Sequence, residues 1–216
     1  MGQCFSDTAS LTDFVNKPGV EDKQLTAQDI NRGLDLTAKH LNGKKKQITV
    51  VAVGGAINTI LLRSRASTAD VDFFSVDTVN NPVLRDGIRS AAKTMQLGDG
   101  WMNNHTALFI ASNTKTDLYN EAIRDGVVIF DKPGLKVVAA PWMYCLVAKL
   151  EKAGKRGNAK SYDMSDAAQY LIQESKRRRA KIKVADIEAK AKAYGVNIQE
   201  AQITQLKALC VGYMEG

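Results

Sequence analysis

The chain has 216 residues, the size of one ordinary domain or of one domain with a small appendage. Apolar residues make up 44% of it and charged residues 25%, a mixture that supports a packed core and excludes disordered and collagen-like chains. No apolar run approaches the roughly 18 residues of a membrane span, and no secretory signal is visible. Three scattered cysteines favour neither a disulfide framework nor a zinc site, so we expect an intracellular, cytoplasmic protein.

Hydrophobic periodicity predicts a mixed α/β portion up to about residue 140, followed by helices. Asn81 and Pro82 mark a helix start, because a capping side chain precedes a proline at the first helical position. In chain order the predicted elements of the first portion are a polar arm over residues 1–24, a helix over 26–41, a strand over 47–53, a helix over 56–64, a strand over 71–76, a helix over 82–95, a strand over 107–111 and a helix over 116–124.

The mixed portion ends with a hairpin predicted around the turn at 131–134, with strands over 127–130 and 135–140. The helices that follow are predicted over 141–152, 163–175, 184–194 and 198–213. Three parts are therefore expected: a flexible N-terminal arm over residues 1–24, an α/β domain over 25–153, and a helical C-terminal region over 154–216 packed on it.

The net charge of +7 is concentrated in one part of the chain. The segment from Lys149 to Lys183 contains eleven Lys or Arg residues against four acids, which equals the whole net charge. Such a basic block favours a polyanionic partner: a nucleotide, a nucleic acid or an anionic lipid. A solvated helical surface is the alternative interpretation.

The most informative segment joins a buried strand to a pair of aspartates. The strand over 47–53 ends on Gly54 and Gly55, where the backbone can approach a phosphate closely and the amides of a helix start attract it. Asp70 and Asp72 follow on the next strand, where residues two apart project from the same face. A divalent cation would relieve the repulsion between the carboxylates, and Mg²⁺ or Mn²⁺ suits such oxygen ligands.

Each half of this pattern also has a common structural explanation. Gly-Gly alone usually marks a tight turn, and Asp-x-Asp alone is frequent on exposed strand edges. Their order and spacing in one segment are those that nucleotidyl transfer requires, since metal ions there bridge a triphosphate during in-line displacement at phosphorus.

These residues resemble the DNA-polymerase-β-like nucleotidyltransferase superfamily, most of all the small branch near the abortive-infection type-IV toxin-like nucleotidyltransferases. The branch pattern of Gly-Gly-x-Ala, Arg-x-Ser/Thr and Asp-hydrophobic-Asp is met by Gly54, Gly55, Arg65, Ser67 or Thr68, Asp70 and Asp72, although Ala56 follows Gly55 directly. Looser likenesses, which extend the resemblance over about residues 45–172, are Trp101–Asn104, the strand 135–140, Lys149, Asp163 and Asp166.

The resemblance implies a minimal nucleotidyltransferase fold of the α+β class, with a small mixed sheet flanked by helices and a helical C-terminal extension. It implies metal-dependent transfer of a nucleoside monophosphate from a nucleoside triphosphate to an unidentified acceptor. Asp70 and Asp72 would be the catalytic pair and would hold Mg²⁺ or Mn²⁺. The residues expected at the nucleotide and its phosphates are Gly54, Gly55, Arg63, Arg65, Ser67, Thr68 and Lys149.

The chain departs from the superfamily in its third carboxylate, which a later strand usually supplies. The strand predicted over 107–111 contains no acid, Asp117 and Asp131 only flank strands, and Asn104 stands where the branch often has Asp. The site would then bind one metal, borrow a carboxylate from elsewhere or be inactive. The alternative function is a catalytically degenerate protein of this fold that binds nucleic acid or another polyanion through Lys149–Lys183.

The first six residues, Met-Gly-Gln-Cys-Phe-Ser, fit the N-myristoylation pattern. Gly2 would carry the myristoyl group and Cys4 a palmitoyl group, and two acyl chains anchor a protein stably. The modification requires a eukaryotic host, where the protein would be membrane-associated. A membrane-tethered adaptor is therefore a third hypothesis.

Structural roles are preferred for the remaining notable residues. Trp101 is predicted to be a core or lid aromatic rather than a platform for a base. Asp163 and Asp166 are predicted to be acids at a helix start. His40 and His105 have no metal partner at a useful spacing.

Overall fold

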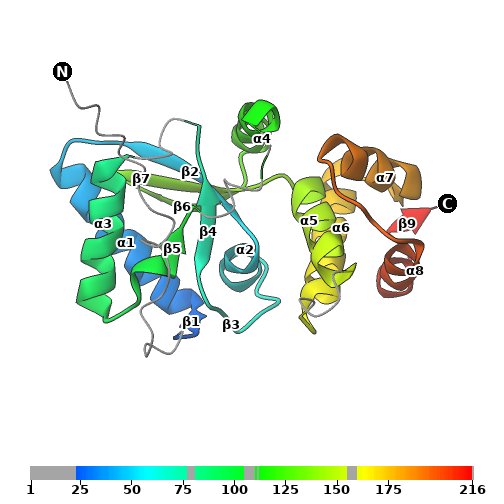
Figure 1. The fold of residues 1–216 in the computed structure, drawn as a ribbon, viewed down its shortest axis with the longest axis horizontal. Coiled ribbons are helices and arrows are strands. Elements are labelled where there is room, and N and C mark those ends of the chain that lie inside the picture. The colour runs from blue at the N-terminus through cyan, green and yellow to red at the C-terminus, as the bar shows by residue number, and fades with distance from the viewer. Residues whose placement is uncertain (1–22, 77–80, 105–109, 111, 155–159, 216) are drawn as a thin grey trace, which may run out of the picture.

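The predicted α+β architecture is confirmed by the structure, a computed structural model that describes residues 23–76, 81–104, 110, 112–154 and 160–215. A five-stranded mixed sheet with helices around it forms one part, and a helical region follows (Figure 1). None of the described helices is long and apolar enough to cross a membrane.

Helices precede, separate and follow short strands along the chain. The described helices are α1 (Ala27–Gly43), α2 (Gly55–Ile60), α3 (Pro82–Met95), the 3-10 helix η2 (Asp99–Trp101), α4 (Ser112–Asp125), α5 (Trp142–Gly154), α6 (Asp163–Arg178), α7 (Val184–Ala193) and α8 (Glu200–Leu209). The strands of the main sheet are β2 (Ile48–Val53), β4 (Val71–Phe74), β5 (Met102–Asn103), β6 (Val128–Lys132) and β7 (Leu135–Ala139). Two-stranded ladders join β1 (Leu25–Thr26) to β3 (Ser67–Thr68) and β8 (Ile182–Lys183) to β9 (Met214–Glu215).

The strand order of the main sheet is β5-β4-β2-β7-β6, with β2 at its centre. β2 pairs in parallel with β7 and antiparallel with β4, and the second pairing puts Val53 beside Asp72. β4 pairs in parallel with β5, which puts Asp72 beside Asn103. The end of the central strand, the aspartate strand and β5 therefore meet at one place.

Two predicted helix starts follow from local side-chain chemistry. Thr26 and Asp29 form a reciprocal capping box, in which the Asp29 amide donates to Thr26 Oγ1 at 3.2 Å and the Thr26 amide donates to Asp29 Oδ2 at 3.0 Å. The Asn81 side chain accepts hydrogen bonds from the amides of Val83 and Leu84. These caps fix where α1 and α3 begin, and hence which residues each helix turns toward the sheet.

Alternation along the strands divides the core into two clusters. β2 contributes Val50 and Ala52 to a cluster with α1 and α3, and Val51 and Val53 to a second cluster with α4, α5 and α6. Phe74 of β4 also belongs to the second cluster. The two faces of the sheet are thus covered by different helices.

The helices α5 to α8 form a group to one side of the sheet (Figure 1). Tyr170 of α6 and Leu206 of α8 belong to the same buried cluster as Val53 of β2, so these helices and the sheet share a core. The ring of Trp142, at the start of α5, stacks on Tyr170 with 6.0 Å between centroids. In space α5 therefore groups with α6, whereas the sequence-based boundary assigned residues 142–153 to the α/β part.

Short strands are the elements that the sequence pattern missed. β5 lies between the helix predicted over 82–95 and the strand predicted over 107–111, where no element was expected, because two residues are too few to show strand alternation. The strand predicted over 107–111 falls, except for Ile110, outside the described residues. α2 and α8 are both shorter than the helices predicted over 56–64 and 198–213.

Trp101 is a core residue, as predicted, and not a platform for a base. Its side chain is buried, and Nε1 donates to the Ile88 carbonyl at 3.1 Å. The ring covers Gly33 of α1, where an added Cβ would lie 2.5 Å from Cη2 of the indole. Trp101 therefore connects α3 to α1, and it packs on α1 at Gly33, where only glycine fits.

We expect Gly33→Ala to lower the free energy of unfolding by about 1–3 kcal/mol, because the overlap forces the ring or the helix to move. Urea unfolding measures this change. Gly43→Ala is the matched control, since nothing lies within 4 Å of a Cβ at that end of α1. Helix propensity alone favours alanine at both positions, so a stabilised Gly33→Ala variant would contradict the close packing of Trp101.

Candidate functional site

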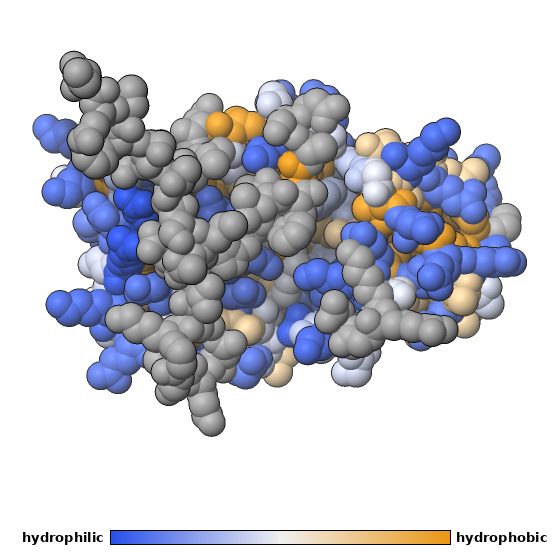
Figure 2. Space-filling view, viewed as in Figure 1, coloured by the Kyte–Doolittle hydropathy of each residue, from blue (hydrophilic) through white to orange (hydrophobic). Residues whose placement is uncertain are grey.

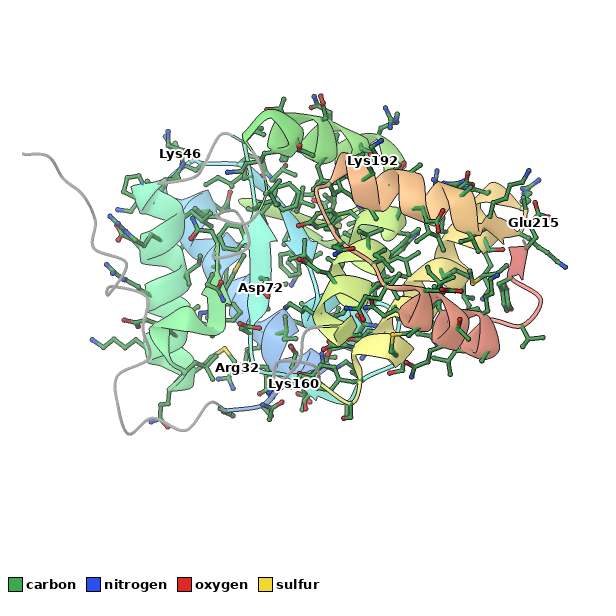
Figure 3. All side chains as sticks on the ribbon, turned by 45° about the vertical axis from the view of Figure 1, so that its right-hand side comes forward. Arg32, Lys46, Asp72, Lys160, Lys192 and Glu215 are labelled. Carbon is green, nitrogen blue, oxygen red and sulfur yellow. The ribbon has the colours of Figure 1, made fainter. Side chains whose placement is uncertain are left out.

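The aspartate pair lies at the start of β4. Asp72 alternates with Val71 and Phe73, which are buried on the side of α1 and α3, so its carboxylate points to the opposite side of the sheet. Figure 3 shows Asp72 in the middle of the molecule. The charge of Asp70 acts directly on Asp72. The structure thus brings the two aspartates together, as the Asp-x-Asp spacing predicts.

Gly54 follows β2 and brings the backbone close to Asp72. Its φ is +68°, in the region that favours glycine, and a Cβ at this position would lie 3.8 Å from Asp72 Oδ2. The Tyr170 hydroxyl lies 2.8 Å from the Gly54 carbonyl oxygen and also bonds to Asn58 Oδ1. Asn58 Nδ2 in turn donates to Ser64 Oγ at 3.0 Å. Tyr170 of α6 therefore helps to hold the turn that carries Gly54.

Asn103 of β5 occupies the strand position beside the aspartate pair. Its Nδ2 donates to Asp70 Oδ2 and to the Gly100 carbonyl, both at 3.2 Å, and its side chain also hydrogen-bonds to Asp72. Among the described residues, no third Asp, Glu, His or Cys completes a metal-ligand cluster with the pair. Asn104 stands where the resembled branch often has Asp, and it is the side chain of the neighbouring Asn103 that hydrogen-bonds to the aspartates.

Burial and the nearby charge of Asp70 raise the pKa of Asp72 to about 6. The charges of Lys152 and Lys149 on α5 and the hydrogen bond from Asn103 act in the opposite direction, but they do not outweigh burial. Two partly buried carboxylates thus share one site. A cation bound between Asp70 and Asp72 would offset both causes of the raised pKa, the burial of Asp72 and the repulsion by Asp70.

Gly55 begins α2 against the side chains of Thr68 and Arg65. A Cβ at Gly55 would overlap Thr68 Oγ1 and lie 2.8 Å from Arg65 Nη1. Thr68 is buried there, whereas Ser67 Oγ donates to Gln24 Oε1 at 3.3 Å in the ladder of β1 and β3. Of the two hydroxyl residues predicted at the phosphates, Thr68 is therefore the one that lies beside the Gly-Gly turn.

Arg63 and Arg65, predicted as a pair of phosphate ligands, have different surroundings. The Arg65 guanidinium lies 3.8 Å from the centroid of the Tyr162 ring, and its Nη1 is 3.6 Å from Asp166 Oδ2. Arg63 is exposed and has a φ of +55°. Arg65 thus connects the segment after α2 to the start of α6, next to Gly55, while Arg63 does not share these contacts.

Lys149 is buried between α5 and α6. Its Nζ lies 2.8 Å from Asp163 Oδ1 and 2.8 Å from Asp166 Oδ2, and we call these three side chains the α5–α6 ion cluster. Burial disfavours the charged ammonium, but the two carboxylates outweigh burial, so the pKa of Lys149 lies above its usual value. Asp163 Oδ2 also accepts from the Lys160 amide at 2.9 Å, which agrees with its predicted place at a helix start. The Lys149 ammonium is therefore engaged by carboxylates of the protein itself.

The basic block from Lys149 to Lys183 is partly neutralised within the fold. Arg177 and Arg178 donate to the buried Glu174 at distances between 2.6 and 2.8 Å, and Arg178 also reaches Asp186 at 2.9 Å. Burial alone would raise the pKa of Glu174, but the hydrogen bonds from Arg177 and Arg178 outweigh burial and hold the pKa below its usual value. Among the described residues, the exposed members of the block without an ion pair are Lys152, Lys160, Lys176, Arg179 and Lys181.

The sequence pattern did not single out Tyr170, Asn58 or Asn103. Tyr170 lies within an amphipathic helix, where an aromatic residue is typical of the core, and only its hydroxyl contact links it to Gly54. Asn103 belongs to the segment Trp101–Asn104, which was quoted for the family resemblance and was the one signal that pointed to it. The lipidation candidates Gly2 and Cys4 lie outside the described residues.

No protein-family model, curated protein or solved structure matches this chain. The family resemblance expected from the sequence therefore rests on the chain's own residues alone.

Proposed function

We propose that the protein is a metal-dependent nucleotidyltransferase, which moves a nucleoside monophosphate from a nucleoside triphosphate to an acceptor. The observation that carries the proposal is the approach of two segments: Gly54 lies close to Asp72, and the charge of the neighbouring Asp70 helps to raise the pKa of Asp72. A glycine turn that lets phosphates approach, and carboxylates that hold their metal ion, are needed side by side for phosphoryl chemistry. The resemblance to the DNA-polymerase-β-like superfamily points to the same reaction.

The chemistry of the donor set suits a hard divalent cation. Asp70 and Asp72 supply carboxylate oxygens, and Asn103 adds an amide; Mg²⁺ and Mn²⁺ take oxygen ligands, with water and phosphate completing the shell. The two causes that raise the pKa of Asp72, burial and the charge of Asp70, are both counteracted by a bound cation. Asp70 and Asp72 would hold the ion, which would supply positive charge to the triphosphate when bound.

Groups around Gly55 support the phosphate end of the nucleotide. Arg65 and Thr68 both lie against Gly55, and a guanidinium matches phosphate oxygens in a two-pronged geometry. Lys152 is exposed on α5, and its charge reaches Asp72. In this proposal Arg65 and Lys152 neutralise the triphosphate, while Lys149 acts only through the α5–α6 ion cluster.

A catalytically degenerate protein that binds a polyanion is the second candidate, and Asn103 is the observation that favours it. A neutral amide beside Asp70 and Asp72 leaves the site with one negative charge fewer than a third carboxylate would give. Such a site offers less compensation to a second divalent cation. Nucleotide binding without transfer would be the signature of this candidate.

Thermal unfolding with nucleoside triphosphates, in Mg²⁺, Mn²⁺ or EDTA, tests the proposal. A ligand that binds only the native state stabilises it by about 2.7 kcal/mol at a hundred times its Kd. We expect a nucleoside triphosphate to stabilise the protein only when the divalent cation is also present. Asp70→Asn combined with Asp72→Asn should abolish it without lowering the melting temperature of the unliganded protein, because like charges are removed.

Transfer of label from α-phosphate-labelled nucleoside triphosphates, measured in parallel, separates the two candidates. Asp86→Asn with Asp117→Asn is the charge-matched control, since both acids are exposed and lie on helices, α3 and α4, that carry none of the proposed site residues. This control should keep the ligand-dependent stabilisation. If the Asp70/Asp72 variant binds metal and nucleotide as the unaltered protein does, the carboxylates are structural and the proposal fails.

A further inference from the structure

A second basic surface lies on the layer formed by α1 and α3. All of its members are exposed, none has an ion pair within the described part of the chain, and they are Lys44, Lys45, Lys46, Arg85, Arg89 and Lys93. We call these six residues the α3 basic surface. Asp86 is the exposed acid among them, and the nearby Asp35 is already engaged by Lys39 and Lys132. Figure 2 shows hydrophilic residues along this edge of the molecule.

Helix geometry arranges three of these cations in a line. Arg85, Arg89 and Lys93 are four residues apart on α3, so they follow one another along one flank with a rise of about 6 Å per step. The buried residues of α3, such as Leu84 and Ile88, lie on a different flank. The spacing is of the order of that between successive phosphates along a nucleic-acid strand.

The packing of α3 on α1 brings three lysines near the first half of α3. A Cβ at Gly87 would lie 3.3 Å from His40 Cδ2 and 3.4 Å from Thr37 Cγ2, so the first half of α3 lies beside the last turns of α1. The segment Lys44–Lys46 follows α1 directly. Figure 3 shows Lys46 at the outer edge of the molecule near one end of α3, away from Asp72.

We propose that the α3 basic surface binds a nucleic-acid strand through its phosphates. None of its six cations has an ion pair among the described residues, whereas in the block around Arg177 and Arg178 the guanidinium groups are already bound by Glu174 and Asp186. Released counterions would supply the binding free energy, so affinity must fall steeply with salt.

The same surface lacks the features of a membrane-binding face. A helix that lies on a bilayer presents large apolar side chains next to its basic ones. The exposed large apolar residues among the described ones are Leu61, Ile123, Val128, Leu209 and Val211, and none belongs to α1 or α3. The chemistry of the face therefore fits a nucleic-acid strand in solution rather than an anionic bilayer.

The proposal does not depend on the nucleotidyltransferase proposal. Asp72 points to the side of the sheet opposite α1 and α3, so a strand bound on the α3 basic surface leaves the aspartate site open. Binding of nucleic acid and binding of Mn²⁺-nucleotide should accordingly be independent. Each can fail without the other.

Fluorescence anisotropy of labelled single- and double-stranded RNA and DNA, between low and physiological salt, measures the affinity and its salt dependence. Arg85→Gln with Arg89→Gln and Lys93→Gln should weaken binding of all sequences similarly. Because each phosphate contact contributes about 0.7 to the slope for single strands and about 0.9 for duplexes, the slope of log affinity against log salt should fall by up to about 2 or about 3. The substitutions are on an exposed flank, and unchanged melting temperatures will verify folding.

Lys176→Gln with Lys181→Gln and Lys192→Gln is the matched control, because it removes three exposed, unpaired cations from the described C-terminal region. This control should keep the affinity and slope of the unaltered protein. Equal loss in both variants, loss in the control alone, or no binding at low salt would each overturn the proposal. Binding to vesicles of anionic phospholipid but not to nucleic acid would overturn it in favour of a membrane partner.

Discussion

Lys149→Met should lower the free energy of unfolding by about 3–5 kcal/mol at neutral pH, because it leaves the carboxylates of Asp163 and Asp166 buried without their shared cation. Both aspartates are almost fully buried, so water cannot replace the ammonium. Arg65 remains 3.6 Å from Asp166 and compensates only in part. Equilibrium unfolding in urea measures the loss.

Lys152→Met, one turn along the same helix, is the matched control, because Lys152 is exposed and should cost less than about 1 kcal/mol. Adding Asp163→Asn and Asp166→Asn to Lys149→Met should recover much of the stability, since removing a whole ion cluster costs less than breaking it. A loss below 1 kcal/mol at pH 7 would show that Lys149 does not stabilise the α5–α6 junction.

The local parts of the candidate site could be predicted because they follow from neighbouring residues. The β-branched run before Gly54 is typical of a buried strand, and the two-residue period puts Asp70 and Asp72 at one place. The Asn81–Pro82 start of α3 likewise depends on contacts within one turn. Each of these features is encoded within a few residues, and each is present in the structure.

The partners of the site could not be predicted because they are distant in sequence. Asn103 reaches Asp70 only through the pairing of β5 with β4, and a two-residue strand gives no periodic signal. Lys149 was expected at the phosphates, yet its ammonium is bound by Asp163 and Asp166, which requires α6 to pack on α5. A lysine among the apolar positions of a helix indicates that the side chain is buried, but the hydrophobic pattern does not predict which carboxylates bind its ammonium.

Asp72→Asn should raise the free energy of unfolding at neutral pH in the absence of divalent cations, by up to about 3 kcal/mol. The pKa of Asp72 is raised to about 6 in the folded protein from an ordinary value of 3.8. Between these values the folded state keeps a proton that the unfolded state has lost, so the contribution of Asp72 to stability falls as pH rises from about 4 to about 6. Above that range the charged carboxylate destabilises the folded state, and the neutral amide avoids this penalty.

Urea unfolding in EDTA from pH 4 to pH 8 would therefore show the two proteins equally stable at the acid end and the variant more stable above about pH 6. At the size of this chain, each kcal/mol corresponds to about 2–4 °C in melting temperature. Asp86→Asn, which removes an exposed acid of α3, should change stability by less than about 0.5 kcal/mol throughout.

Mn²⁺ should stabilise the unaltered protein and not the Asp72→Asn variant, and so remove the difference in stability between them at neutral pH. A gap that is absent in EDTA would mean that Asp72 is hydrated enough to carry its charge without cost, whereas a gap that Mn²⁺ leaves unchanged would mean that the penalty at Asp72 does not serve to bind metal.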